Sequence, residues 1–477
     1  MKLKTYLNGP SMNNNEINQN KPLINIKHIL QTTKVGDIVQ LEGWVRSTRL
    51  QKKIGFIDLT DGSCMCGIQI VIEQSKYHPS SEKCELFENL NKSVTIGSSI
   101  SIEGTILENP SGKGKEVSAM SIRVVGSCDA TDYPLQKKRH SFEFLRTIAH
   151  LRTKTNTLAA IGRIRHQMSY HTHKYFNDNG YIHLHAPIIT TSDCEGAGDM
   201  FLVETNDKNE HFFGKKAHLT VSGQLHAEIY AQSFKRTYTF GPTFRAENSH
   251  TSRHLAEFWM IEPELSFINV DDLLNSIESY IKYVTKSILE NCMEDLNLFN
   301  KFISPGIIER HQELLNSPFA RISYTEAIDI LKQAEKTFEH NAEWGCDLQS
   351  EHERYICEVH TKKPTFVTDY PKEIKAFYMK LNDDGKTVSA VDLIVPGIGE
   401  LVGGSMREDE ISTLKIKLQE NELSEETYWW YLELRKYGST PHGGYGVGFE
   451  RFIKYITGMD NIRDVIPFPR YQGYAEF

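Results

Sequence analysis

Five short runs of strand-forming residues follow one another between Asp37 and Val125, and this crowding most restricts how the chain can fold. Gly, Asp, Asn, Pro or Ser separates each run from the next, as expected between strands. Strands so short and so closely spaced are typical of a small barrel. The runs are residues 37–45, 54–61, 67–73, 93–106 and 117–125. We therefore expect a five-stranded barrel within residues 23–128.

The pattern changes in residues 129–140, which are rich in Asp, Pro and Lys and are typical of a hinge. Beyond the hinge, the spacing of apolar residues predicts a helix over 155–178, and further helical stretches alternate with strand-type runs. We therefore expect residues 141–477 to form a larger α+β domain. Residues 1–22 are polar and rich in Asn, which predicts a flexible extension.

The net charge of −8 is unevenly distributed along the chain. Counting Lys and Arg against Asp and Glu, residues 1–140 carry +4 and the remainder carries −12. A basic front part favours a module that faces phosphate groups. The sequence has no membrane-length apolar run and no export signal, and its 8 Cys lack the paired spacing of a zinc ribbon. We therefore expect a cytoplasmic protein that does not enter a membrane.

Glycine alternates with other residues from Gly444 to Gly448. In a strand, this alternation clears side chains from one face, so that a flat ring or a sugar can lie against bare backbone. Arg451 follows and offers a permanently charged fork that suits phosphate. A glycine-rich turn beside a surface pair of Glu450 and Arg451 would explain the same residues.

A second candidate site combines Arg245 and Glu247 with a polar loop and the segment from His254 to Phe258. On a strand, Arg245 and Glu247 would point to the same face. One guanidinium and one carboxylate could then hold different parts of a single ligand. The alternative is a surface ion pair, which is worth at most about 1 kcal/mol.

Taken together and in chain order, residues 244–258 resemble motif 2 and residues 446–452 resemble motif 3 of the class II aminoacyl-tRNA synthetases. The predicted helix at 155–178 and the strand ending at Pro187 resemble motif 1. A barrel followed by a hinge is similar to the subclass of aspartyl, asparaginyl and lysyl enzymes, whose N-terminal OB-fold reads the anticodon. The resemblance implies an α+β protein: an OB-fold β-barrel, then a catalytic domain built on an antiparallel sheet with flanking helices.

Several longer segments are similar to the asparaginyl members of that subclass. Aspartyl enzymes usually carry a lysine where this sequence has Ala227, and Glu228 stands beside it. A cation that would neutralise an aspartate side chain is therefore missing. The segments are residues 219–228, 245–264, 369–380, 395–404 and 461–470. The resemblance implies ligation of asparagine to its tRNA through an asparaginyl-adenylate. The alternatives are an aspartyl enzyme, including one that charges two tRNAs, and a non-catalytic RNA-binding paralogue.

The resemblance also implies roles for single residues. Arg245 and Arg451 are expected to be catalytic through the α- and γ-phosphates of ATP. Because asparagine and aspartate have almost the same shape, Glu228 is expected to accept from the substrate amide, directly or through a water, and Arg407 to donate to its oxygen. The implied ATP-binding residues are Arg245, Glu247, His254, Phe258, Glu400 and Arg451; the amino-acid-binding residues are Glu195, Ser222, Gln224, Glu228, Glu262 and Arg407; the Mg²⁺ ligands are Glu400 and Asp392.

In the barrel, aromatic and amide groups on a sheet face can stack on and read unpaired bases. The implied anticodon-binding residues are Arg46, Arg49, Phe56 and Gln69, although Phe56 could instead belong to the barrel core. The expected partners are tRNA(Asn), asparagine, ATP and a second copy of the chain that pairs through motif 1. We expect no binding to DNA.

Overall fold

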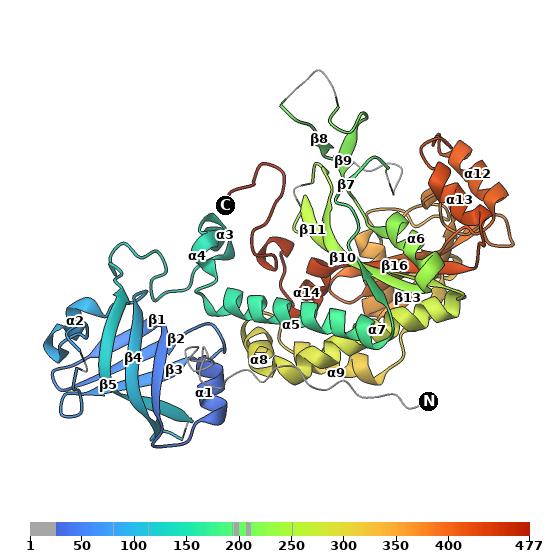
Figure 1. Ribbon diagram of the computed structural model, residues 1–477. Helices are drawn as coiled ribbons and strands as arrows, with labels where there is room; N and C mark the ends of the chain where they lie inside the picture. The colour runs from blue at the N-terminus through green and yellow to red at the C-terminus, as the bar shows by residue number, and fades with distance from the viewer. Residues whose placement is uncertain are drawn as a thin grey trace, which may run out of the picture. The chain divides into compact units, whose positions relative to one another are not determined.

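The chain divides between Arg139 and His140 into two units (Figure 1). The structure is a computed structural model that describes residues 25–79, 81–112, 114–192, 194, 200–206, 211–249 and 251–477. The extension expected over residues 1–22 lies outside the described residues.

The first unit contains a closed five-stranded barrel in the order β1-β2-β3-β5-β4. Neighbouring strands are antiparallel except β3 and β5, which are parallel. A short helix, α2, lies between β3 and β4 in the chain, as in an OB-fold. The elements are α1 (Ile26–Thr32), β1 (Ile38–Leu50), β2 (Ile54–Thr60), β3 (Ile68–Glu73), α2 (Leu90–Ser93), β4 (Ser99–Glu108) and β5 (Lys115–Gly126). The predicted barrel is confirmed.

Alternation along β2 shows why these residues form a barrel. Ile57 and Leu59 are buried in the barrel core, whereas Phe56 and Asp58, which alternate with them along the strand, lie on the outer face. Phe56 is therefore not a core residue, and the alternative explanation for it is wrong.

The second unit is built on an eight-stranded sheet in the order β12-β13-β14-β15-β16-β11-β10-β6. Only the outer pairs β12/β13 and β10/β6 are parallel. A separate three-stranded sheet has the order β7-β9-β8. The strands are β6 (Ile182–Leu184), β7 (Ile189–Thr190), β8 (Leu202–Val203), β9 (Ala217–Leu219), β10 (Arg236–Phe244), β11 (Glu257–Ser266), β12 (Ala320–Ser323), β13 (Thr365–Pro371), β14 (Thr387–Val395), β15 (Gly399–Met406) and β16 (His442–Gly448). The expected largely antiparallel sheet is confirmed.

Helices flank this sheet, and α5 and α7 to α9 pack together along it (Figure 1). The helices are α3 (Phe142–Thr147), α4 (Ala149–Arg152), α5 (Asn156–Asp178), α6 (Gln224–Phe234), α7 (Val270–Asn291), α8 (Met293–Phe302), α9 (Ile307–Asn316), α10 (Tyr324–Lys332), α11 (Ser350–Arg354), α12 (Ile411–Glu420), α13 (Trp429–Lys436) and α14 (Phe449–Thr457). The predicted helix at 155–178 is α5. None of the described helices is both long and apolar enough to cross a bilayer.

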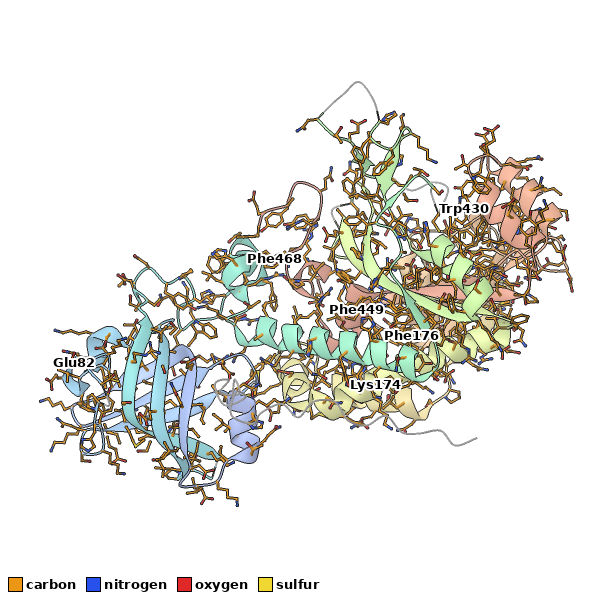
Figure 2. The ribbon with its side chains drawn as sticks, in the orientation of Figure 1. Glu82, Lys174, Phe176, Trp430, Phe449 and Phe468 are labelled. Carbon is orange, nitrogen blue, oxygen red and sulfur yellow. The ribbon has the colours of Figure 1, made fainter. Side chains whose placement is uncertain are left out.

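The apolar face of α5 is covered within the chain. Phe176 of α5, which is labelled in Figure 2, stacks on Tyr238 of β10 with ring centres 4.5 Å apart and on Tyr280 of α7 at 5.0 Å. This helix face therefore needs no second chain to bury it. Exposed apolar side chains remain at Ile182 on β6, an edge strand, and at Ile188 and Ile189 in the segment that follows it.

One buried ion pair ties α5 to the start of α14. Arg165 on α5 lies 2.7 Å from the carboxylate of Glu450, and the N–H of Trp259 donates to the same carboxylate at 2.9 Å. Glu450 is therefore a buried residue that joins α5, β11 and α14. The explanation by a surface pair of Glu450 and Arg451 is wrong.

Candidate active site

A polar cavity of about 210 Å³ opens between β11, β15, β16 and the first turn of α6. Residues 222–224 lead into α6 here. The side chains of Ser222 and Gln224 therefore face the cavity beside Glu262 of β11. The carboxylate of Glu262 accepts hydrogen bonds from the Ser222 hydroxyl, from the N–H of Gly223 at 2.8 Å and from the Thr239 hydroxyl at 2.8 Å. These bonds fix a negative charge at the cavity wall, where a substrate ammonium can bind.

Arg407 supplies the positive charge of the same cavity. It follows β15 and is buried, with its guanidinium 5.1 Å from the centre of the Tyr378 ring. Two of its nitrogens donate to Glu264, one of them at 3.2 Å, and a third donates to Ser405 at 2.9 Å. Burial and the charges of Glu228 and Glu262 raise the pKa of Glu264, while Arg407 opposes them. Glu264 thus holds the guanidinium in one orientation.

Gly444 on β16 makes room for that pair. A Cβ atom at this position would lie 2.1 Å from Oε1 of Glu264, so no other residue fits without moving the carboxylate. The sequence predicted that this glycine face accommodates a flat ligand. At Gly444 the cleared space is instead filled by Glu264, whereas Gly446 does line the cavity.

Glu228 lies behind the cavity and does not line it. Its oxygens accept from Tyr431 at 2.7 Å, from Arg435 at 2.9 Å and from the side-chain NH₂ of Gln224 at 3.1 Å. Burial raises its pKa, but Arg435, His442 and Arg407 together hold that pKa below the usual range. Direct contact between Glu228 and the substrate amide is therefore not what this geometry offers. Glu228 instead orients Gln224, whose carbonyl oxygen is left to accept from the substrate.

A second cavity, of about 130 Å³, adjoins the first, and Arg245, Met260, Glu400 and Gly446 line both. Its other walls include four of the residues implied to bind ATP: Glu247, His254, Phe258 and Arg451. The two cavities form one cleft: the first cavity contains residues implied to bind the amino acid and is called the amino-acid end, and the second contains residues implied to bind ATP and is called the phosphate end.

Arg245 and Glu247 lie just beyond β10, which ends at Phe244, so the expected placement on a strand is wrong. The N–H of Arg245 still donates to Ala256 at 3.0 Å, and this bond carries the strand pairing one residue further. The Arg245 guanidinium lies 5.5 Å from the centre of the Phe258 ring and 3.9 Å from the Glu247 carboxylate. The two residues therefore meet at the cleft as predicted, although on a loop.

Carboxylates gather where the two cavities meet. Glu400 lies 3.4 Å from Arg451, and Asp392 forms an ion pair with Lys375 at 2.7 Å. Although burial raises it, the pKa of Glu400 is lowered by the charges of Arg451, Lys375 and Arg245. Burial and then the charge of Glu400 raise the pKa of Glu353 to about 7.

A bulge explains how Glu400 and Asp392 come together. Leu393 pairs with Val402 but Ile394 pairs with Glu400, so Leu401 is an extra residue in β15. A Cβ on Gly403 would lie 3.2 Å from a Glu400 oxygen and 3.6 Å from an Asp392 oxygen. Both carboxylates therefore flank one point of the cleft, where hard oxygen ligands suit Mg²⁺.

The outer face of the barrel carries the residues implied to bind the anticodon. Phe56 pairs with Arg49 of β1 and Val71 of β3, while Gln69 pairs with Asp58 and its NH₂ donates to Glu116 at 3.1 Å. The Arg46 guanidinium donates to the carbonyl of Met65 at 3.4 Å. A stacking ring, an amide and two guanidinium groups thus share the first three strands.

The chain resembles known proteins over most of its length. Residues 142–472 match the family model of class II tRNA synthetases (D, K and N), and residues 39–125 match that of OB-fold nucleic acid binding domains. An asparagine–tRNA ligase of Clostridium novyi (strain NT) is 52% identical over 95% of this chain and 99% of that protein. The chain belongs to the class II tRNA synthetases, in their asparaginyl branch.

Solved structures of the asparaginyl branch share the whole fold. The enzyme of Pyrococcus horikoshii complexed with asparaginyl-adenylate superposes with a TM-score of 0.83 at 30% identity, covering 95% of this chain and 99% of that chain. The enzyme of Entamoeba histolytica in complex with asparaginyl-adenylate gives 0.79 at 28% identity, covering 93% and 97%.

For an asparaginyl-type synthetase, the structure brings nearly all the implied residues into one cleft, with Glu228 behind it. Glu195 lies outside the described residues. Sequence reasoning missed Glu264, Lys375 and Tyr378, which line the first cavity, and Glu353, which accepts a hydrogen bond from the N–H of Glu400 at 3.3 Å. Lys375 and Tyr378 stand in the 369–380 segment, whose similarity to asparaginyl enzymes was the available signal.

Proposed function

We propose that the chain joins asparagine to tRNA(Asn) in two ATP-dependent steps. The asparagine carboxylate attacks the α-phosphorus of ATP and pyrophosphate leaves; the terminal ribose hydroxyl of the tRNA then takes the asparaginyl group and AMP leaves. The observation that carries this proposal is that Arg245 lines both ends of the cleft. The similarity to asparagine–tRNA ligases favours asparagine over the aspartyl and non-catalytic alternatives.

At the phosphate end, positioning and charge compensation supply most of the catalysis. Arg245 binds the α-phosphate and compensates the charge that develops there, and Arg451 binds the γ-phosphate. Phe258 stacks on the adenine, and Glu247 and His254 hold the nucleotide by hydrogen bonds. The closeness of Arg245 to the Phe258 ring supports this arrangement, because one nucleotide can touch both.

At the amino-acid end, Glu262 binds the substrate ammonium together with Ser222, and Glu195 belongs to the same set. Arg407 donates to the side-chain oxygen. Gln224 accepts from the side-chain NH₂, because its own NH₂ is engaged by Glu228. Aspartate offers no N–H to that acceptor, and no lysine replaces Ala227 to neutralise its second oxygen.

ATP enters with Mg²⁺, and Glu400 and Asp392 are the proposed ligands. No group of three or more His, Cys, Asp or Glu side chains within the described part of the chain could hold a metal ion alone. Mg²⁺ fits nonetheless, because it is usually bound by one or two carboxylates plus substrate phosphates. Bound there, the ion would neutralise phosphate charge, and at Asp392 it would take the place of the Lys375 ammonium.

The barrel reads the anticodon of tRNA(Asn), with Phe56 stacking on an unpaired base and Gln69 donating or accepting at a base edge. Arg46 and Arg49 contact the RNA backbone. The position of these side chains on one outer face of β1 to β3 supports the proposal.

The enzyme acts as a homodimer in the cytoplasm. Exposed apolar residues beside the edge strand β6 support a contact between two copies. None of the 8 cysteines, which all lie within the described residues, forms a disulfide, and this suits a reducing compartment.

The proposal is tested by ATP–pyrophosphate exchange with asparagine and with aspartate, followed by charging of tRNA(Asn). We expect exchange that depends on asparagine and is at least 100-fold slower with aspartate. Equal exchange with both amino acids would contradict the assigned specificity, and no exchange with either would contradict the reaction.

A further inference from the structure

A cavity of about 1000 Å³ in the second unit lies outside the cleft. Its walls come from α9, α14, the turn between β14 and β15, and the segment that follows α11. Six cationic side chains line it, against three acidic ones: Arg253, Arg310, Arg354, Lys362, Lys363 and Lys454, with Glu313, Glu358 and Asp460. The excess of positive charge in a concave space favours an anionic ligand.

Lys454 on α14 is the most informative of these cations. Its side chain is buried, with 7% of the residue exposed, and no hydrogen bond or ion pair engages it among the described residues. Because most of the residue is buried while the side chain lines the cavity, an anion bound in the cavity would supply the partner that this ammonium lacks. Burial and then the charge of Arg253 lower the pKa of Lys454 to about 8, and only Asp460 opposes them.

This basic cavity continues the phosphate end of the cleft. Arg253 lines both spaces, and Lys454 follows Arg451 by one turn of α14. Burial and the charges of Arg354 and Arg451 lower the pKa of Arg253. These cations repel one another. A polyanion bound between them, next to the γ-phosphate position, would stabilise them.

A buried histidine adds a neutral polar group to the same wall. Nε2 of His311 donates to the carbonyl of Ile456 at 3.0 Å, so Nδ1 of the neutral ring is an acceptor. Nδ1 is buried and has no partner among the described residues. Burial lowers the pKa of His311 to about 4, so the ring adds no positive charge to this wall.

We propose that this cavity is a second polyphosphate site, in which Lys454, Arg354 and Arg253 bind a phosphoanhydride chain beside the nucleotide cleft. Two sources offer this chemistry: the pyrophosphate released in the first step, and the tail of a second nucleoside polyphosphate. Only the first source rests on the proposed function. The site itself is defined by pyrophosphate or ATP binding that depends on Lys454.

The test counts bound ligand by equilibrium dialysis of the full chain with labelled pyrophosphate, and separately with labelled ATP, each with Mg²⁺. In a second set of measurements, a non-hydrolysable asparaginyl-adenylate analogue fills the adenylate part of the cleft, so that only ligand outside that part is counted. We expect two pyrophosphate or ATP molecules per chain in the free protein. Lys454→Met should weaken one of them at least tenfold, and Lys454→Arg should restore it. Lys286→Met, which removes an exposed lysine of α7, is the matched control and should change neither.

The measurements with pyrophosphate and with ATP distinguish the two sources of the ligand. Binding of pyrophosphate at the Lys454-dependent site identifies the released product, and binding of ATP alone identifies a second nucleotide. AMP, which has no phosphoanhydride, should not compete. One ligand per chain, two ligands unaffected by Lys454→Met, or competition by AMP equal to that by ATP would overturn the proposal. Exchange measured on the same preparation tests the proposed function independently.

Discussion

Replacing Gly444 by alanine should impair asparagine binding without touching the asparagine cleft directly. The added Cβ would lie 2.1 Å from one oxygen of Glu264 and 2.5 Å from the other. The backbone of β16 is held by β11 and β15 on both sides, so the carboxylate must move. Arg407 then loses the two bonds that orient it.

The size of the effect follows from those bonds. A hydrogen bond to a charged group contributes about 1.5 to 3 kcal/mol. If Arg407, once it is no longer held in position, loses this amount of binding energy toward asparagine, kcat/KM for asparagine in ATP–pyrophosphate exchange should fall roughly 10- to 150-fold. KM for ATP should stay within about twofold, because Arg245 and Arg451 are not displaced.

Two controls separate this explanation from general damage. Gly162→Ala on α5 introduces a Cβ with nothing within 4 Å, and it should leave kinetics unchanged. In Glu264→Ala, the further change Gly444→Ala should cost almost nothing, because the carboxylate that it displaces is already gone. Activity of Gly444→Ala within twofold of the parent, or full additivity in the double variant, would refute the reasoning.

Further predictions concern the other parts of the molecule. Arg245→Ala should abolish exchange, a loss of about 3 to 4 kcal/mol in transition-state binding, with an unchanged circular dichroism spectrum as the check on folding. Phe56→Ala should raise KM for tRNA(Asn) by at least fivefold in charging assays and leave exchange intact, since stacking on a base is worth about 1 to 3 kcal/mol. The pKa of Glu353 is raised from 4.5 to about 7, so this residue stabilises the fold at low pH and that stability is lost as pH rises through 7. Glu353→Gln should therefore flatten the pH dependence of the free energy of unfolding between about pH 5 and 7, as measured by urea titration. Ile182→Asp should shift sedimentation from dimer to monomer, and a dimer of unchanged affinity would contradict the proposed interface.

Much of the architecture was readable from local patterns. The strand runs before residue 125 and the helix at 155–178 follow from periodic apolar residues, and both appear in the structure. Arg245, Phe258 and Arg451 could be grouped because short motifs place each of them beside residues of recognisable chemistry.

The misses arise where distant segments meet. Glu264 and Gly444 are 180 positions apart, and only their strand pairing shows that a glycine on β16 serves a carboxylate on β11. Glu228 was assigned to the substrate because Tyr431, Arg435 and His442, which occupy its oxygens, lie more than 200 residues away. Spacing between Asp392 and Glu400 could not reveal the bulge at Leu401.

The ion pair between Arg165 and Glu450 couples the position of α5 to that of Arg451. A helix of 23 residues spans about 35 Å. Near the middle of α5, Arg165 pairs with Glu450, the residue directly before Arg451. The far end of α5 leads into β6, where apolar side chains are exposed. If Arg451 binds the γ-phosphate as proposed, displacing α5 along its axis would move that ligand, and turnover would be sensitive to substitutions, or to contacts, far from any bound substrate.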